Sequence, residues 1–333
     1  PVVIGNGATP PPSVSWRAFR LAALVALLIW SAWVIGALWF LPLRGFPVVA
    51  TVAYAAGSIY LIGTGARRCA ARLTAVVTVV WCLAMRPSND RPWTADQARL
   101  PEVTLAGDGL TVRGVRTCDY RSTTDYTVHH DDRDFDLREL ETVWFIVEPF
   151  STWSAAAHTF LSFGFSDGRY LAISVEIRKE VGEHFSPLAG IYRSYELTYV
   201  IGDERDLVRL RANYRKDDVY LYRARATREQ ARALFVSMLE RSQRLHDRPE
   251  FYNTLTNTCT TNIVSHIRSI WPGRVPYSLD VLLPGNADRL AYDIGLIDDD
   301  APFEVCRQRH RINDRSLLAD QDADFSRLIR IGF

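Results

Sequence analysis

The first 86 residues of this 333-residue chain contain no Asp, Glu or Lys. Their only charges are seven Arg, so the remaining residues hold 32 of the 39 basic side chains and all 38 acidic ones. The formal net charge of +1 therefore hides a first quarter at +7 and a remainder at −6. This distribution excludes a plain cytosolic enzyme, a disordered chain and a strongly basic nucleic-acid binder. Lysine is also scarce, with only two residues, which we interpret as a compositional bias of the genome.

Three uncharged, hydrophobic runs fill the acid-free segment. Residues 21–41 are long enough to cross a hydrocarbon core of ~30 Å. Residues 47–66 form a second run, and residues 73–85 form a third that is short for a span. We therefore predict a membrane anchor over residues 1–86 with about three transmembrane helices. A cleaved signal peptide is the alternative, but the total length and the later runs disfavour it.

Arginine placement predicts the orientation of the anchor. Arg17 and Arg20 precede the first run, and a cluster that begins at Arg67 separates the second run from the third. The positive-inside rule places both groups in the cytoplasm. Three spans then send the rest of the chain across the membrane, whereas two would keep it in the cytoplasm.

The remaining chain is organised as strands followed by helices. Residues 87–100 are polar and predict a linker or docking strap. Strand patterns dominate residues 101–222, and a Thr227–Gln230 capping box then opens a helix. This order predicts an α+β fold. We expect a catalytic domain over residues 87–275 and a C-terminal extension over residues 276–333, which packs on the domain or forms a tail.

Five cysteines leave the redox chemistry open. If the second part lies outside the cytoplasm, Cys118 and Cys306 could form a disulfide and leave Cys259 free. The sequence alone does not test that pairing.

Residues 158–177 predict a β-hairpin that places a histidine opposite a glutamate. Each strand alternates an apolar face with a mostly polar or small one. Matching the apolar faces pairs Leu161 with Ile173 and leaves a three-residue Ser-Asp-Gly loop. A two-residue turn would shift the register by one and break the match. The favoured register sets His158 opposite Glu176, where the carboxylate would fix the imidazole tautomer; a surface cross-strand pair is the alternative.

Cys259 lies at the start of a predicted helix. A stripe of isoleucines begins at Ile263, and the Asn and Thr residues before it are typical of a helix start. In a first turn the helix dipole favours the thiolate, and free backbone N–H groups can bind an oxyanion. A small buried core residue is the alternative. His266 lies about 10 Å further along the axis, too far to activate the thiol. His158, Glu176 and Cys259 therefore form a candidate base, orienting and nucleophile set.

Three further residues are candidates for substrate binding. Arg209 and Arg211 alternate on one face of an expected strand and could bind a lipid phosphate; solvated charges paired with nearby acids are the alternative. Asn257 is the third, beside the cysteine. The acid-rich stretch that contains His129 and His130 is not expected to hold a metal, because consecutive strand residues point apart. No cofactor is expected either.

A resemblance to a known family rests on three long motifs. These are AHTFLSFGFSDGRYLAISVEIRKE, YELTYVIGDERDLVRLRANYR and RPEFYNTLTNTCTTNI. They resemble the periplasmic domain of Lnb-type bacterial lipoprotein N-acyltransferases over roughly residues 88–270. That family is similar to NlpC-type thiol hydrolases and to lecithin:retinol acyltransferase, in which the papain-like order is circularly permuted and His precedes Cys. The resemblance implies such a domain here, with His158 and Cys259 as the catalytic pair.

The resemblance also implies a reaction and a location. An acyl chain would pass from a phospholipid through a Cys259 thioester to the N-terminal amine of a bacterial lipoprotein. The enzyme would sit in the bacterial inner membrane with its catalytic domain facing the periplasm. A cell-wall amidase or peptidase with the same thiol chemistry, a phospholipase, and a non-enzymatic membrane interaction protein are the rival readings.

Overall fold

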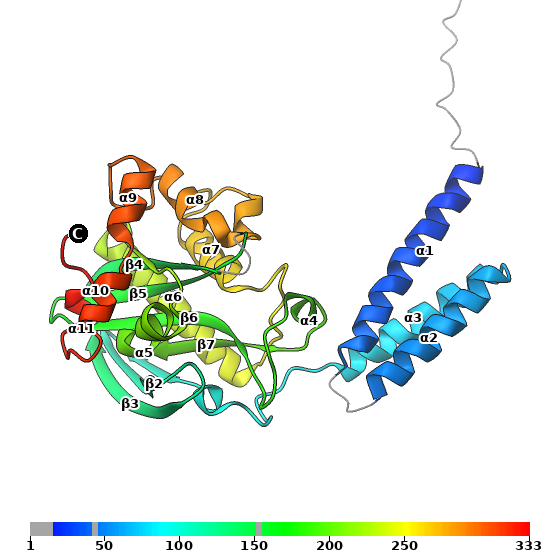
Figure 1. Ribbon diagram of the computed structural model, residues 1–333, viewed down its shortest axis with the longest axis horizontal. Helices are drawn as coiled ribbons and strands as arrows, with labels where there is room; N and C mark the ends of the chain where they lie inside the picture. The colour runs from blue at the N-terminus through cyan, green and yellow to red at the C-terminus, as the bar shows by residue number, and fades with distance from the viewer. Residues whose placement is uncertain (1–15, 42–45, 151–154) are drawn as a thin grey trace, which may run out of the picture. The chain divides into compact units, whose positions relative to one another are not determined.

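The computed structural model describes residues 16–41, 46–150 and 155–333. It divides into two compact units, Pro1–Arg86 and Pro87–Phe333. Figure 1 shows a helical unit and a larger unit built around a β-sheet. Each unit is described separately.

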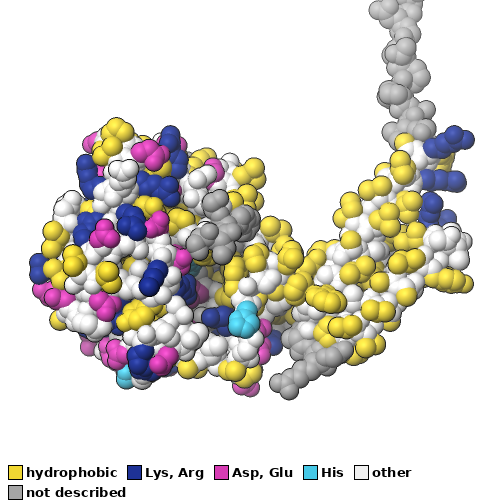
Figure 2. All heavy atoms as spheres, in the orientation of Figure 1, with side chains coloured by type: hydrophobic (Ala, Val, Ile, Leu, Met, Phe, Trp, Pro, Cys, Tyr) yellow, Lys and Arg dark blue, Asp and Glu magenta, His cyan; other side chains and the backbone are white. Residues whose placement is uncertain are grey.

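The helical unit contains α1 (Trp16–Trp39), α2 (Phe46–Gly63) and α3 (Arg67–Ala84). Val34, Leu38 and Tyr54 form its small core, and the Tyr54 hydroxyl lies 2.8 Å from Thr74 Oγ1. The outer surface is mainly apolar, and the arginines visible in Figure 2 gather at the end where α1 begins. By length and composition, α1 and α2 are candidate membrane spans. Whether α3 also crosses the membrane stays a prediction.

The sheet of the second unit has eight strands. They are β1 (Glu102–Ala106), β2 (Gly109–Tyr120), β3 (Tyr126–Asp136), β4 (Leu140–Pro149), β5 (Ala157–Phe165), β6 (Tyr170–Arg178), β7 (Glu196–Gly202) and β8 (Tyr220–Arg223). The strand order is β1-β2-β7-β6-β5-β4-β8, and β3 pairs with β2. All neighbours are antiparallel except β2 and β7. This mixed sheet with helices confirms the α+β class; the papain-like permutation stays a prediction.

The β5–β6 hairpin has the predicted register. Leu161 pairs with Ile173 and Phe163 with Leu171, around a loop in which Gly168 has a φ of 85°. The apolar alternation determines this outcome, because a slip by one residue would turn every buried side chain to the other face. Glu148 of β4 is the cross-strand partner of His158 on its other side.

Helices cover both faces of the sheet (Figure 1). One face packs against α6 (Arg228–Asp247) and α7 (Cys259–Ile270). Both helices begin with a complete capping box, at Thr227 and at Thr258, as the start signals predicted. The opposite face carries α5 (Glu204–Arg209), a π-helical turn (Leu210–Arg215) and the end of the chain.

The strand expected over residues 208–214 is wrong, because these residues form α5 and the π-helical turn. Asp203 caps α5 by accepting the Arg205 N–H, and Leu207 and Val208 are fully buried against the sheet. The alternation of Arg209 and Arg211 imitated a strand, whereas the apolar pair Leu207 and Val208 just before them packs on the sheet from one face of a helix.

The last 58 residues pack on the sheet unit. They contain α8 (Ala287–Asp293), α9 (Phe303–His310), α10 (Asn313–Leu318) and α11 (Phe325–Leu328). Phe325 and Ile329 are fully buried in the same core as β4 and β5. The small helix α4 (Pro187–Ile191) lies between β6 and β7. The disulfide considered between Cys118 and Cys306 is not formed: both are free and lie in separate buried clusters.

Candidate active site

Cys259 is the first residue of α7 and is 8% exposed. Thr258 caps the helix by accepting the Thr261 N–H, and the Thr261 hydroxyl accepts the Thr258 N–H. In the described part of the chain, the N–H groups of Cys259 and Thr260 have no acceptor. These two donors lie at the positive end of the helix dipole, so the turn can stabilise a thiolate and an oxyanion.

His158 is joined to Glu176 through a serine. His158 Nε2 lies 2.7 Å from Ser174 Oγ, and the Ser174 hydroxyl donates to Glu176 Oε1 at 2.8 Å. The direct distance from His158 Nε2 to Glu176 Oε1 is 4.0 Å. Because Ser174 gives its proton to the carboxylate, it must accept one from Nε2–H. This arrangement leaves Nδ1 with the lone pair that a base needs.

A buried cluster of charges surrounds this chain of hydrogen bonds. Arg211 Nε contacts Glu148 Oε2 and its Nη2 contacts Glu176 Oε1, each at 2.8 Å. Burial would raise the pKa of Glu176, but Arg211 and His158 hold that pKa well below its usual value. Burial, with Arg211 adding to it, lowers the pKa of His158 to about 4. At neutral pH the site therefore contains an ionised Glu176 and an uncharged imidazole.

One hydrogen bond connects the strand of the histidine to the helix of the cysteine. Thr159 Oγ1 and Thr260 Oγ1 are 2.9 Å apart, and these residues directly follow His158 and Cys259. His158 and Thr159 point to opposite faces of the sheet, because strand side chains alternate. Among the described residues no hydrogen bond joins Cys259 to His158, and Cys259 Sγ lies 3.7 Å from Thr260 Oγ1. The structure thus brings the two segments together without forming the nucleophile–base contact.

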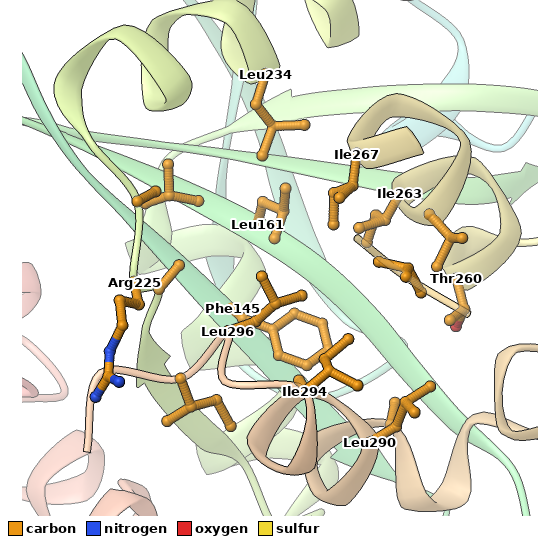
Figure 3. Close-up of a pocket in the computed structure, with 18 of the residues that line it drawn as sticks. Phe145, Leu161, Arg225, Leu234, Thr260, Ile263, Ile267, Leu290, Ile294 and Leu296 are labelled. Atoms are coloured by element: carbon orange, nitrogen blue, oxygen red, sulfur yellow. The ribbon is translucent and has the colours of Figure 1, made fainter. Parts of the chain in front are cut away.

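An apolar cavity adjoins the start of α7 (Figure 3). Its empty volume is about 820 Å³, including the open space at its mouth, and its lining is almost wholly hydrophobic. Phe145 and Leu161 of the sheet form one wall, and Ile263 and Ile267 of α7 form another. The segment 280–297 closes the outer side. Thr260 and Arg225 lie on opposite sides of the cavity, so the residue that follows Cys259 belongs to its lining.

The other predicted binding residues hold the structure together. Arg211 is 2% exposed and fully engaged with the two glutamates. Arg209 is 3% exposed and donates to the Asp320 carbonyl. Asn257 donates to the Phe251 carbonyl and accepts from Asn262, which fixes the loop before Cys259.

Sequence reasoning missed Ser174 and Glu148. Ser174 lies two residues before Glu176 on the same face, so the strand alternation could have identified it. Nothing in the sequence predicted that Glu148 of β4 would lie directly beside His158, because that pairing depends on the order of strands in the sheet. The cavity was also missed, since its walls come from segments far apart in the chain.

The geometry is that of a cysteine at a capped helix start, beside a strand that carries a histidine. Residues 126–285 match the family model described as the Lnb N-terminal periplasmic domain. This segment runs from the first residue of β3 past α7 and includes His158, Glu176 and Cys259. No curated protein and no solved structure matches the chain. The family indicates an Lnb-like role in the processing of lipoproteins in the periplasm.

Proposed function

We propose that this protein is a membrane-anchored N-acyltransferase that uses Cys259 as its nucleophile. The acyl chain would move from a phospholipid to the cysteine and then to the N-terminal amine of a bacterial lipoprotein. The observation that carries this proposal is the apolar cavity lined by Thr260, the residue next to Cys259. Its lining is almost wholly hydrophobic, which suits an acyl chain rather than a peptide or sugar.

The first half of the reaction makes a thioester. His158 takes the proton of the Cys259 thiol, and the thiolate attacks the carbonyl carbon of the phospholipid ester. The N–H groups of Cys259 and Thr260 stabilise the oxyanion. As the carbon–oxygen bond breaks, the lysophospholipid alkoxide receives the proton from His158. The acyl chain then lies on sulfur, with its tail in the cavity.

The second half returns the cysteine to its starting state. The lipoprotein amine attacks the thioester carbon, His158 takes a proton from the nitrogen, and the carbon–sulfur bond breaks. The thiolate leaves and is protonated again by His158. Ser174 and Glu176 act as positioning residues, because they hold Nε2–H and so leave the lone pair on Nδ1. The reaction requires a contact between His158 and Cys259, so the His158 side chain would have to turn from the face of Ser174 toward the start of α7 when the substrate binds.

The anchor would place the domain at its lipid substrate. A periplasmic domain requires an odd number of spans if the N-terminus is cytoplasmic, so α3 would be the third span of the inner membrane. The two arginine groups lie at the same end of the helical unit, which supports this orientation (Figure 2).

The test is intact-mass spectrometry of the full chain after incubation with phospholipid. Wild type should gain one acyl mass that hydroxylamine removes, Cys259→Ser should gain none, and Cys118→Ser is the matched buried-cysteine control that should behave as wild type. A diacyl lipopeptide should then discharge the adduct and become triacylated.

Release of lysophospholipid is measured in parallel, because fast hydrolysis would hide the adduct. Lysophospholipid without acylated peptide would identify a phospholipase. An alkylatable Cys259 without adduct or lysophospholipid would favour the amidase, and an inert Cys259 would refute thiol catalysis altogether.

A further inference from the structure

A second cluster of polar side chains lies in the C-terminal extension. Asp299 precedes α9, and Cys306 and His310 are one turn apart on that helix. One ligand atom from each of the three residues lies within 4.8 Å of the other two. Cys306 is fully buried and His310 is 3% exposed, so the cluster is enclosed by the fold. None of these residues contributes to the reaction proposed above.

The hydrogen bonds of His310 show that a positive charge is required between two of these groups. His310 Nδ1 lies 2.8 Å from the Leu221 carbonyl oxygen, which can only accept, so Nδ1 carries the proton. In a neutral imidazole Nε2 then has a lone pair, and it faces Asp299 Oδ2 at 3.1 Å. Two acceptors at this separation repel each other unless a cation or a second proton lies between them.

The groups around the cluster resemble the outer shell of a metal site. A metal-binding histidine commonly donates its other N–H to a backbone carbonyl, as His310 does. Asp299 Oδ1 accepts the Ala301 N–H, which fixes the carboxylate. The ring of His310 stacks on Phe333 with centroids 4.5 Å apart. Arg309 also contacts Asp299 Oδ2, at 2.9 Å, and is the one competing cation among the described contacts of this carboxylate.

We propose that Asp299, Cys306 and His310 bind a structural zinc ion. Zinc takes thiolate, imidazole and carboxylate ligands at about 2.0–2.3 Å, which places ligand atoms roughly 3.3–3.7 Å apart. The separation between Nε2 and Oδ2 is close to this range, and the sulfur needs to approach by about 1 Å at most. A water molecule would complete the tetrahedral coordination. The thiolate and carboxylate neutralise the ion, so Arg309 faces a site without net positive charge.

Such an ion would stabilise one wall of the apolar cavity. The ligands attach α9 and the loop before it to β8 through Leu221, and Leu296 and Ile297 of the cavity lining lie immediately upstream. Loss of the ion should therefore loosen the segment 280–297, while leaving the hydrogen bonds of His158 intact. The zinc site does not depend on the proposed acyltransferase reaction.

The experiment is metal analysis of the full-length chain, purified in detergent without a polyhistidine tag and dialysed after exposure to zinc chloride. Wild type and the buried-cysteine control Cys118→Ser should hold about one zinc per chain. In Cys306→Ser and His310→Ala the bound zinc per chain should be at least tenfold lower. Cobalt exchanged into wild type should show thiolate-to-metal absorption that Cys306→Ser lacks. A zinc-free wild type would refute the proposal and identify His310 as an imidazolium paired with Asp299. Zinc retained equally by Cys306→Ser would refute the site as well.

Discussion

Replacement of Arg211 by Met should destabilise the sheet unit strongly. The guanidinium is 2% exposed and lies between Glu148 and Glu176, with both contacts at 2.8 Å. Removing one partner of a buried ion pair leaves uncompensated charge and costs about 3–5 kcal/mol. At ~2–4 °C per kcal/mol, the melting temperature should fall by about 6–20 °C.

Thermal unfolding of the full chain in detergent measures this effect. Arg327→Met is the control, because Arg327 and Asp324 form an exposed pair whose loss should cost at most ~1 kcal/mol. Adding Glu148→Gln to Arg211→Met should recover part of the loss, since it removes a buried charge whose remaining ion pair is the 3.3 Å contact with the more exposed Arg215.

The pH dependence adds an internal check. In wild type the pKa of Glu176 is lowered, so its stabilisation is present above about pH 4.3, its unfolded value, and is lost as the pH falls through the folded pKa. Without Arg211, burial raises that pKa, and the deficit of the variant should shrink in acid. A variant no less stable than the control at neutral pH would refute the account of the charge cluster.

Three further predictions concern catalysis. Because burial lowers the pKa of His158 to about 4, kcat/KM should fall only below roughly pH 4. A fall of kcat/KM near the ordinary histidine pKa of ~6.5 would contradict this. Ser174→Ala should lower kcat by about 10–100-fold with little change in KM, and it should shift the pH at which kcat/KM falls. A purely structural role of Ser174 would change the stability of the protein alone. Ala226→Phe, at the Arg225 end of the cavity, should reduce kcat/KM by roughly fourfold per methylene that no longer fits, measured over donors of increasing chain length. Ala106→Phe on the exposed β1 should leave chain-length preference unchanged.

Local patterns in the sequence predicted the elements nearest the cysteine and histidine. The hairpin register followed from alternation alone, the capping box of α6 followed from Thr227 and Gln230, and the start of α7 followed from the Asn and Thr residues before its apolar stripe. These features depend on interactions within about twenty residues, so one segment contains the information.

Local patterns could not predict the interactions between segments that are far apart in the sequence. Arg211 looked like a surface charge on a strand, because its partner Glu148 lies 63 residues away in sequence. Ser174 was visible on the correct face, but the 4.0 Å gap that it bridges between His158 and Glu176 depends on side-chain placement. Burial of these charges is a property of the assembled sheet and its covering helix.

The family match ends at residue 285, while Ala287, Leu290, Ile294 and Leu296 still line the cavity. The proposed catalytic residues and much of the cavity wall therefore occupy separate stretches of the gene. Substitutions in the later stretch would alter which lipids fit without touching Cys259 or His158. A lineage that meets new membrane lipids could adapt by changing that stretch alone, and exchanging it between relatives would transfer donor preference as a unit.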